Sequence, residues 1–292
     1  MAAIPALEAH PALPAVPFWK LSGSGNDFVA LREPAAAPAP EEIRAWCRRG
    51  VSLGADGLIA LRRGAAGQGV EMDYWNADGH PADLCLNGTR CAARLAFELG
   101  WGEESLSIRT AAGTYAAREL PGSRIELTLP FPAEPPRALD LAVEGVRHRA
   151  WFLTVGVPHL VLLWPESLAR APVGALGAPL RAHPDLGPAG ANVDFVRFPG
   201  RRRMEIRTFE RGVEGETLSC GTGVLAAAAV GLHLGLAELP VTVATQGGFE
   251  LEVGGDRGSG RFTLAGDARI VARGELLAEA GALPAPPPWA AR

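Results

Sequence analysis

The chain has 292 residues, 48% of them hydrophobic, and a formal net charge of −4 at pH 7. This length allows a large core and favours about two domains of ordinary size. The slightly acidic balance offers no basic face for nucleic acid or for an anionic membrane. We therefore expect a small-molecule partner.

The N-terminal end and the cysteines indicate the compartment. The first 16 residues contain no Lys or Arg, so the basic segment of a secretory signal is missing and a flexible extension is expected. The longest uncharged helical run, 221–235, is shorter than the roughly 20 apolar residues that cross a bilayer. Four cysteines without regular spacing indicate free thiols in a reducing compartment. We expect a cytoplasmic protein.

The same order of predicted elements occurs twice along the chain. Each half starts with strand-like segments and a polar turn, continues with an alternating strand, and then places a cysteine before a helix and a strand hairpin. In the first half these segments are 18–31, 54–61, 70–79, 85–100 and 106–117; in the second they are 151–163, 190–198, 203–215, 220–235 and 241–253.

Aligning Cys85 with Cys220 brings other residues into register. Glycines at 88 and 223, threonines at 110 and 245, and helix-ending glycines at 100 and 235 then fall at equal offsets. A repeat this long predicts an α+β fold of two pseudo-symmetric domains, each a sheet wrapped around a central helix. The expected halves are 17–130, joined by a returning segment 268–283, and 131–267; a Pro-rich tail, 284–292, follows.

The two aligned cysteines each precede a helix. A helix N-terminus presents free N–H groups and the positive end of the helix dipole, which bind a carboxylate and lower the pKa of a thiol. Two thiols on opposite sides of a bound amino acid could remove a proton from one face of the α-carbon and return one to the other. Cys85 and Cys220 are therefore the candidate bases of a cofactor-independent epimerase or racemase.

Other sites are not indicated. Cys47 and Cys91 are expected to be buried hydrophobic residues. The spacing of Cys85 and Cys91 does not match a tetrahedral zinc site, so no metal is predicted. The glycines of "GSGND" lack the third glycine of a dinucleotide fingerprint, and no phosphate-binding G-K-[ST] sequence is present.

The motifs "GSGNDFV", "YWNADG", "CLNGTRC" and "ERGVEGETLSCGTG" resemble those of the diaminopimelate epimerase family over roughly residues 17–275. The resemblance implies a pyridoxal-independent isomerase that converts LL- to meso-diaminopimelate in lysine and peptidoglycan precursor synthesis. It also implies a homodimer, no cofactor and the same two-half fold, with the active site in the interdomain cleft.

Site residues carry over by motif position. Cys85 and Cys220 resemble the catalytic thiols, and His159 and Glu210 resemble the pair that tunes their protonation. The residues that resemble substrate-binding positions are Asn26, Asn76, Leu86, Asn87, Asn192, Glu210, Arg211, Gly221 and Thr222.

Three positions depart from the family pattern. Leu86 stands where the family usually has glycine, so a side chain lies where the backbone approaches the ligand. Gly57 and Val157 stand where many members carry Gln and Asn that contact substrate, so they are possible, divergent contacts.

Two alternatives therefore stay open beside diaminopimelate epimerisation. One is racemisation of another amino acid, such as histidine, on the same fold. The other is a non-catalytic binding protein that retains the fold, against which the two intact cysteines count.

Overall fold

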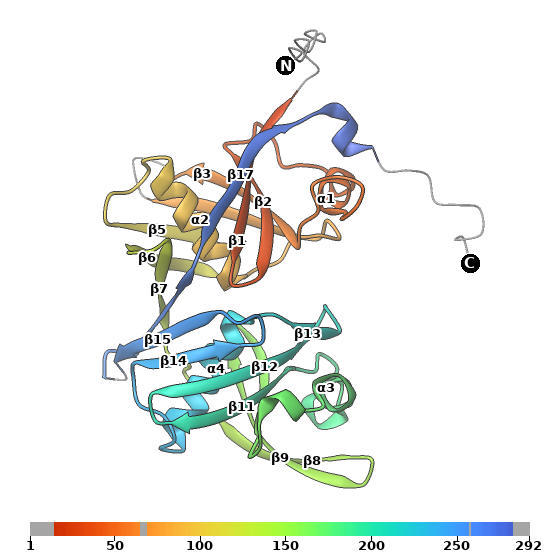
Figure 1. The fold of residues 1–292 in the computed structure, drawn as a ribbon, viewed down its shortest axis with the longest axis vertical. Helices are drawn as coiled ribbons and strands as arrows, with labels where there is room; N and C mark the ends of the chain where they lie inside the picture. Colours follow the sequence, from red (N-terminus) through yellow and green to blue (C-terminus); the bar gives the residue numbers. More distant parts are fainter. Residues whose placement is uncertain (1–14, 65–68, 257, 283–292) are drawn as a thin grey trace, which may run out of the picture.

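A computed structural model describes residues 15–64, 69–256 and 258–282 and confirms the predicted α+β fold (Figure 1). Nearly all of the predicted extension, 1–16, and the whole predicted Pro-rich tail, 284–292, lie outside the described residues. The two halves lie one above the other along the long axis of the molecule, and their strands form one continuous sheet.

The N-terminal half consists of strands that surround one long helix. Its elements are β1 (Val16–Gly23), β2 (Asn26–Arg32), α1 (Pro40–Cys47), β3 (Gly57–Arg63), β4 (Val70–Asn76), α2 (Leu86–Glu98), β5 (Ser105–Thr110), β6 (Gly113–Leu120), β7 (Arg124–Pro130) and β17 (Arg269–Leu276).

The C-terminal half repeats this plan. Its elements are β8 (Arg137–Val143), β9 (Val146–Val155), β10 (Val157–Leu163), α3 (Val173–Arg181), β11 (Asn192–Gly200), β12 (Arg203–Glu210), β13 (Gly215–Thr217), α4 (Gly221–His233), β14 (Val241–Thr245), β15 (Glu250–Asp256) and β16 (Arg261–Asp267), with single 3₁₀ turns at Leu168–Arg170 and Pro184–Leu186. A further 3₁₀ turn, Ala278–Gly281, follows β17 in the N-terminal half.

Strand pairing follows the predicted repeat. β2 pairs parallel with β3 and β10 pairs parallel with β11, whereas β3–β4 and β11–β12 are antiparallel. The predicted hairpins are β5–β6 and β14–β15. Gly100 and Gly235 end the two long helices with φ of 69° and 71°, the left-handed conformation that glycine adopts without steric cost.

The two long helices are central, as predicted. α2 packs against β1 to β7 and β17, and α4 packs against β9 to β12, β15 and β16. Both helices are buried along most of their length, and residues 224–230 of α4 are all apolar and buried. Burial of this apolar surface is the main favourable contribution to folding. The cysteine that begins each helix is thereby held at the inner end of a rigid element.

The chain returns to its N-terminal half after Ala268. β17 pairs antiparallel with β1. β16 pairs with β7 of the N-terminal half, which joins the sheets of the two halves. These pairings support the predicted division of the chain, and we propose residues 17–130 with 268–283, and residues 131–267, as the two domains.

Two short helices, α1 and α3, were not expected from the sequence. α1 has eight residues, begins at Pro40 and has Glu41 and Glu42 in its first turn. α3 contains Pro179 and two glycines, which obscure a helical pattern. α1 buries Cys47 beside Trp46, so Cys47 has the core position that the sequence predicts.

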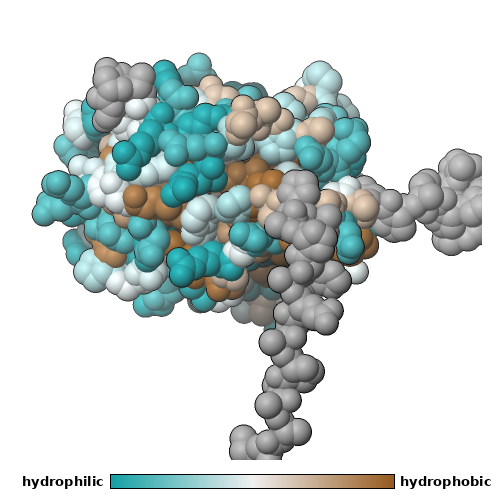
Figure 2. Space-filling view, turned by 90° about the horizontal axis from the view of Figure 1, so that it is seen from above, coloured by the Kyte–Doolittle hydropathy of each residue, from teal (hydrophilic) through white to brown (hydrophobic). Residues whose placement is uncertain are grey.

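The face of the N-terminal half that is seen from above is largely hydrophilic, with apolar residues gathered in a band across it (Figure 2). None of the helices within residues 15–64, 69–256 and 258–282 combines the length and apolar character that membrane crossing requires.

Candidate active site

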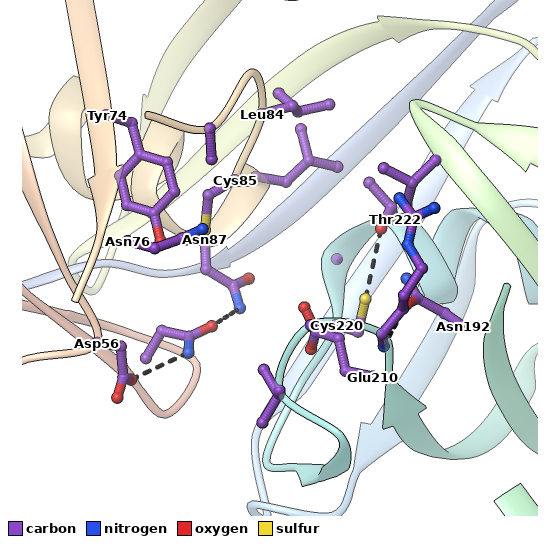
Figure 3. Close-up of a pocket in the computed structure, with 18 of the residues that line it drawn as sticks. Asp56, Tyr74, Asn76, Leu84, Cys85, Asn87, Asn192, Glu210, Cys220 and Thr222 are labelled. Atoms are coloured by element: carbon purple, nitrogen blue, oxygen red, sulfur yellow. Dashed lines mark hydrogen bonds between the residues drawn. The ribbon is translucent and has the colours of Figure 1, made fainter. Parts of the chain in front are cut away.

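A cavity of about 500 Å³ lies between the two halves. Figure 3 shows Cys85 on one side of it with Tyr74, Asn76 and Asn87, and Cys220 on the other side with Asn192 and Glu210 (Figure 3). Its lining includes twelve of the fourteen residues that the sequence singles out: Asn26, Asn76, Cys85, Leu86, Asn87, Val157, Asn192, Glu210, Arg211, Cys220, Gly221 and Thr222.

Each of the two cysteines is the N-cap of its helix. Cys85 has extended backbone (φ −137°, ψ 104°), and its Sγ accepts a hydrogen bond from the Gly88 N–H at 3.4 Å. Cys220 has a similar backbone (φ −116°, ψ 108°), and its Sγ lies 3.4 Å from the Thr222 hydroxyl oxygen. The first N–H groups of a helix have no partner inside the helix, so both helix starts offer donors to a ligand in the cavity.

The two helices meet at their first residues. A Cβ built on Gly221 would lie 3.0 Å from the Leu86 Cβ, so Gly221 leaves the room that Leu86 occupies. Leu86 is only 3% exposed and belongs to the main core cluster. The leucine in place of the family's glycine therefore packs largely into the core, and the residue also lines the cavity.

Burial, rather than the helix N-terminus, dominates the acidity of both thiols. Burial raises the pKa of Cys85 to about 11, although the N–H of Gly88 partly offsets this. Burial also raises the pKa of Cys220 well above its ordinary value, and the charges of Glu210 and Asp194 add to the rise. The prediction of lowered thiol pKa values is thus wrong for the free protein, because loss of solvation disfavours the thiolate more than the helix N-terminus favours it.

Asn87 connects the two halves at the cavity wall. Its Nδ2 donates to the Ser219 carbonyl at 3.0 Å and to the Asn26 Oδ1 at 2.6 Å. Its Oδ1 accepts from the Nη2 of Arg90, at 2.8 Å. Arg90 is fully buried and also donates to the Ser24 hydroxyl at 2.8 Å. Every polar atom of the Asn87 side chain is therefore engaged in positioning the cavity wall.

Among the residues of the N-terminal wall that the sequence analysis missed are Asp56 and Tyr74. Asp56 accepts a hydrogen bond from Asn26 Nδ2 at 3.1 Å. Gly57 itself does not line the cavity: a Cβ there would lie 2.6 Å from Tyr74 Cε2 and 2.9 Å from the Tyr74 hydroxyl oxygen. Absence of a side chain at 57 thus leaves room for the Tyr74 ring.

Adjacent strands β10, β11 and β12 form the C-terminal wall. Val157, Asn192 and Glu210 line the cavity from these strands. The Asn192 Oδ1 accepts the backbone N–H of Arg211 at 2.8 Å, which fixes the turn after β12. Burial raises the pKa of Glu210. The wall therefore carries an anchored arginine beside a carboxyl group that holds its proton more tightly than usual.

His159 lies behind this wall rather than in it. The side chain is fully buried and is not part of the cavity lining. Its Nδ1 lies 2.7 Å from Asp194 Oδ2, and its Nε2 has no hydrogen-bond partner among the described residues. Asp194 was missed by the sequence analysis, although it stands two residues after Asn192 on the same strand, a spacing that places both on one face.

No metal-binding cluster of three or more His, Cys, Asp or Glu side chains occurs in the part of the chain that the structure describes.

Comparison with known proteins decides the family. The family model for diaminopimelate epimerase matches residues 18–119 and 151–271. The chain belongs to the diaminopimelate epimerase family. Members of this family are isomerases, and the family predicted from the motifs is confirmed.

Similar proteins match over nearly the whole chain. It is 38% identical to the diaminopimelate epimerase of Gemmatimonas aurantiaca, over 89% of this chain and 98% of that protein. It is 34% identical to the diaminopimelate epimerase of Aquifex aeolicus, over 90% of this chain and 98% of that protein.

Solved structures show the same fold at low identity. A phenazine biosynthesis PhzF family protein of Enterococcus faecalis is 16% identical and superposes with a TM-score of 0.68, covering 90% of this chain and 99% of that one. A hydroxyproline epimerase of Agrobacterium vitis is also 16% identical, with a TM-score of 0.67 and coverage of 91% and 93%.

Proposed function

We propose that this protein interconverts LL- and meso-diaminopimelate without pyridoxal, with Cys85 and Cys220 as the two bases. One observation carries the proposal: the equivalent cysteines of the two repeats, each at a helix N-terminus, line the same cavity from opposite sides. In the forward reaction, the thiolate of one cysteine takes the proton from the α-carbon. The thiol of the other then donates a proton to the opposite face.

The helix starts support binding of the reacting end. We assign the α-carboxylate, where negative charge grows as the proton leaves, to the N–H groups of Leu86, Asn87, Gly221 and Thr222, four residues that line the cavity. A thiolate whose thiol has a raised pKa is scarce at neutral pH, but it is a strong base once formed. The α-ammonium of a bound substrate and the donors at the helix starts favour its formation.

The distal end of diaminopimelate carries a second ammonium and a second carboxylate. Arg211 offers a forked donor to the carboxylate. Asn76, Asn192 and Glu210, which also line the cavity, offer acceptors to the ammonium group. Gly57 and Val157 contribute no polar side chain, so recognition of the distal end falls on these other residues.

Exchange of solvent deuterium into the α-position tests the proposal. In D₂O the wild-type protein, with no added cofactor, is expected to exchange the α-proton of LL-diaminopimelate and to form the meso isomer, as followed by NMR. Cys85→Ala and Cys220→Ala are each expected to abolish epimerisation, whereas the control Cys91→Ala, in the core of α2, retains it.

Three outcomes would overturn the proposal. Epimerisation at a wild-type rate in either cysteine variant would contradict the two-base assignment. Faster exchange with histidine or another monocarboxylate than with LL-diaminopimelate would assign the protein to racemisation of that amino acid. Absence of exchange with any amino acid would indicate a binding protein.

A further inference from the structure

Arg211 lies on the turn between β12 and β13 and, of the Arg and Lys residues that the structure describes, is the only one that lines the cavity. Its backbone N–H donates to Asn192, and its Nη1 lies 3.4 Å from the Ala189 carbonyl. No carboxylate of the described residues forms an ion pair with its guanidinium. The positive charge of Arg211 is therefore free to meet an anionic group of a ligand.

An acidic residue, Glu214, lies three positions further along the same turn. It has a positive φ of 54°, a left-handed conformation that costs a non-glycine residue free energy. Its N–H donates to the Glu210 carbonyl at 2.8 Å, which closes the turn. The pKa of Glu214 lies below its ordinary value, chiefly because the carboxylate accepts the Gly212 N–H; the charges of Arg181 and Arg211 also lower it. A carboxylate on this turn could therefore neutralise the arginine of the cavity.

Arg181, the last residue of α3, binds this carboxylate instead. Its Nη2 lies 2.7 Å from Glu214 Oε1, the oxygen that also accepts the Gly212 N–H at 3.0 Å. The carbonyl of Arg181 accepts the Ala191 N–H at 3.1 Å, and α3 packs against β12 and β13 (Figure 1), so the end of the helix is fixed beside the turn. Neither Arg181 nor Glu214 lines the cavity. The Glu214 carboxylate is thus held by two donors other than Arg211.

We propose that Arg181 is a positioning residue that withholds the Glu214 carboxylate from Arg211, so that the Arg211 guanidinium stays free for the distal carboxylate of the substrate. The inference deepens the proposed function and rests on it. Once Arg181 is lost, a pair within the turn is available to Glu214, and this pair competes with the ligand for the forked donors of Arg211. Arg181 therefore controls affinity for a substrate with an anionic distal end and leaves the chemistry at the α-carbon unchanged.

Three variants separate this competition from a loss of structure. Arg181→Met removes the cation and leaves the Glu214 carboxylate free to pair with Arg211. Glu214→Gln keeps a side-chain oxygen for both donors but carries no charge. The double variant Arg181→Met, Glu214→Gln lacks the original ion pair and also lacks the competing carboxylate. The control is Arg149→Met, which removes an ion pair with Asp140 between β8 and β9.

The first readout is the rate at which phenylglyoxal, an arginine-specific reagent, modifies Arg211 in the free protein, followed by peptide mass spectrometry. The reagent attacks the unprotonated guanidine, so pairing with a carboxylate slows it. We expect the rate to fall about three- to fivefold in Arg181→Met, the size expected of a partly exposed ion pair. It should return to within about twofold of the wild type in the double variant. Glu214→Gln and the control Arg149→Met should react as the wild type does.

The second readout is steady-state epimerisation of LL-diaminopimelate. KM should rise about three- to fivefold in Arg181→Met and recover in the double variant. The value of kcat should stay within about twofold in every variant, because neither Arg181 nor Glu214 lines the cavity. A purely structural role of Arg181 would leave KM of the double variant as high as that of Arg181→Met.

An Arg181→Met variant with the modification rate or the KM of the wild type would overturn the inference, and so would a double variant as impaired as Arg181→Met. Slower modification of Arg211 in the wild type than in Glu214→Gln would also overturn it. That comparison remains decisive if circular dichroism shows that Arg181→Met has not folded. Modification by phenylglyoxal needs no substrate, so it tests the inference even if the wild type turns over no diaminopimelate and the proposed function fails.

Discussion

The side chain of Asn87, on the first turn of α2, donates a hydrogen bond to the backbone carbonyl of Ser219, the residue before Cys220, at 3.0 Å. This contact ties the start of one central helix to the segment that leads into the other. Asn87 is only 2% exposed, so water does not replace the bond if it is lost.

Asn87→Leu should therefore lower both stability and activity. It leaves the buried Ser219 carbonyl without its donor, which costs about 1–3 kcal/mol, and it also removes the donor to the partly buried side-chain oxygen of Asn26. The shifted thiols should lower kcat by up to about 100-fold. Urea unfolding and the epimerisation rate measure the two effects.

The control Thr89→Val removes a hydrogen bond inside α2, to the Cys85 carbonyl, and should nearly preserve the rate. Equal rates in the two variants would contradict a role for the contact between halves.

Alkylation of Cys85 in the free protein should require high pH. Burial raises its pKa to about 11, so the thiolate that reacts with iodoacetamide forms mainly as the pH approaches that value. Peptide mass spectrometry gives the extent of Cys85 alkylation as a function of pH and hence the pH at its midpoint. Urea-unfolded protein is the control, because its thiols have ordinary pKa values. A midpoint near or below the ordinary value would show that the helix N-terminus outweighs burial.

The same shift determines how stability depends on pH. The folded state binds the thiol proton more tightly than the unfolded state, whose thiol has its ordinary pKa of 9.0. The unfolded state therefore loses its proton first as pH rises, and the free energy of unfolding should fall above about pH 9. The buried thiol of Cys47, with a pKa raised to about 12, acts in the same direction. Urea unfolding at pH 8 and at pH 10 gives the free energy of unfolding at each pH. Greater stability at pH 10 would contradict the predicted decrease.

Arg211→Lys should weaken use of LL-diaminopimelate. Its backbone is held by Asn192, and its Nη1 makes only a 3.4 Å contact with the Ala189 carbonyl, so the guanidinium remains available to a ligand. Lysine keeps the charge but loses the forked geometry, a loss of about 1.5–3 kcal/mol, or roughly 10- to 100-fold in kcat/KM. Deuterium exchange into an amino acid without a distal carboxylate should barely change. An equal loss for both substrates would place Arg211 at the reacting end instead.

Tyr74→Phe should lower kcat/KM modestly. Burial raises the pKa of the Tyr74 phenol, so the hydroxyl stays protonated and can donate to an anionic group in the cavity. Loss of one such bond costs about 1 kcal/mol, or roughly fivefold in kcat/KM. Steady-state kinetics with LL-diaminopimelate measures the change. Unaltered kinetics would mean that the hydroxyl does not contact the substrate.

The sequence predicted the parts of the site that depend on the repeat. Equal offsets around Cys85 and Cys220 predicted two equivalent buried helices, each with a cysteine at its start. Two similar halves that pack together can bring these equivalent helix starts to one shared cavity. Most polar lining residues followed from motif position. His159 was also predicted, but its place behind the wall was not.

Other features depend on distances that only the folded chain defines. Asp194 was overlooked because its partner His159 is 35 residues away and adjoins it only when β10 and β11 pair. Tyr74 was overlooked because an aromatic residue on an alternating strand usually indicates core. The thiol pKa values were predicted in the wrong direction because the sequence showed the helix N-terminus but not how far the thiols are buried.

Leu86 and Gly221 occupy equivalent positions of the two repeats, one residue after each cysteine, and they touch each other. Perfect internal symmetry would place the same residue on both sides of this contact. Two glycines would fit, but two leucines would collide, since even one added Cβ at 221 comes to 3.0 Å from Leu86. The leucine in the first half is therefore tolerated only because the second half kept its glycine. In a chain built from two copies of the first half, the two helix starts would therefore have to move apart at this pair.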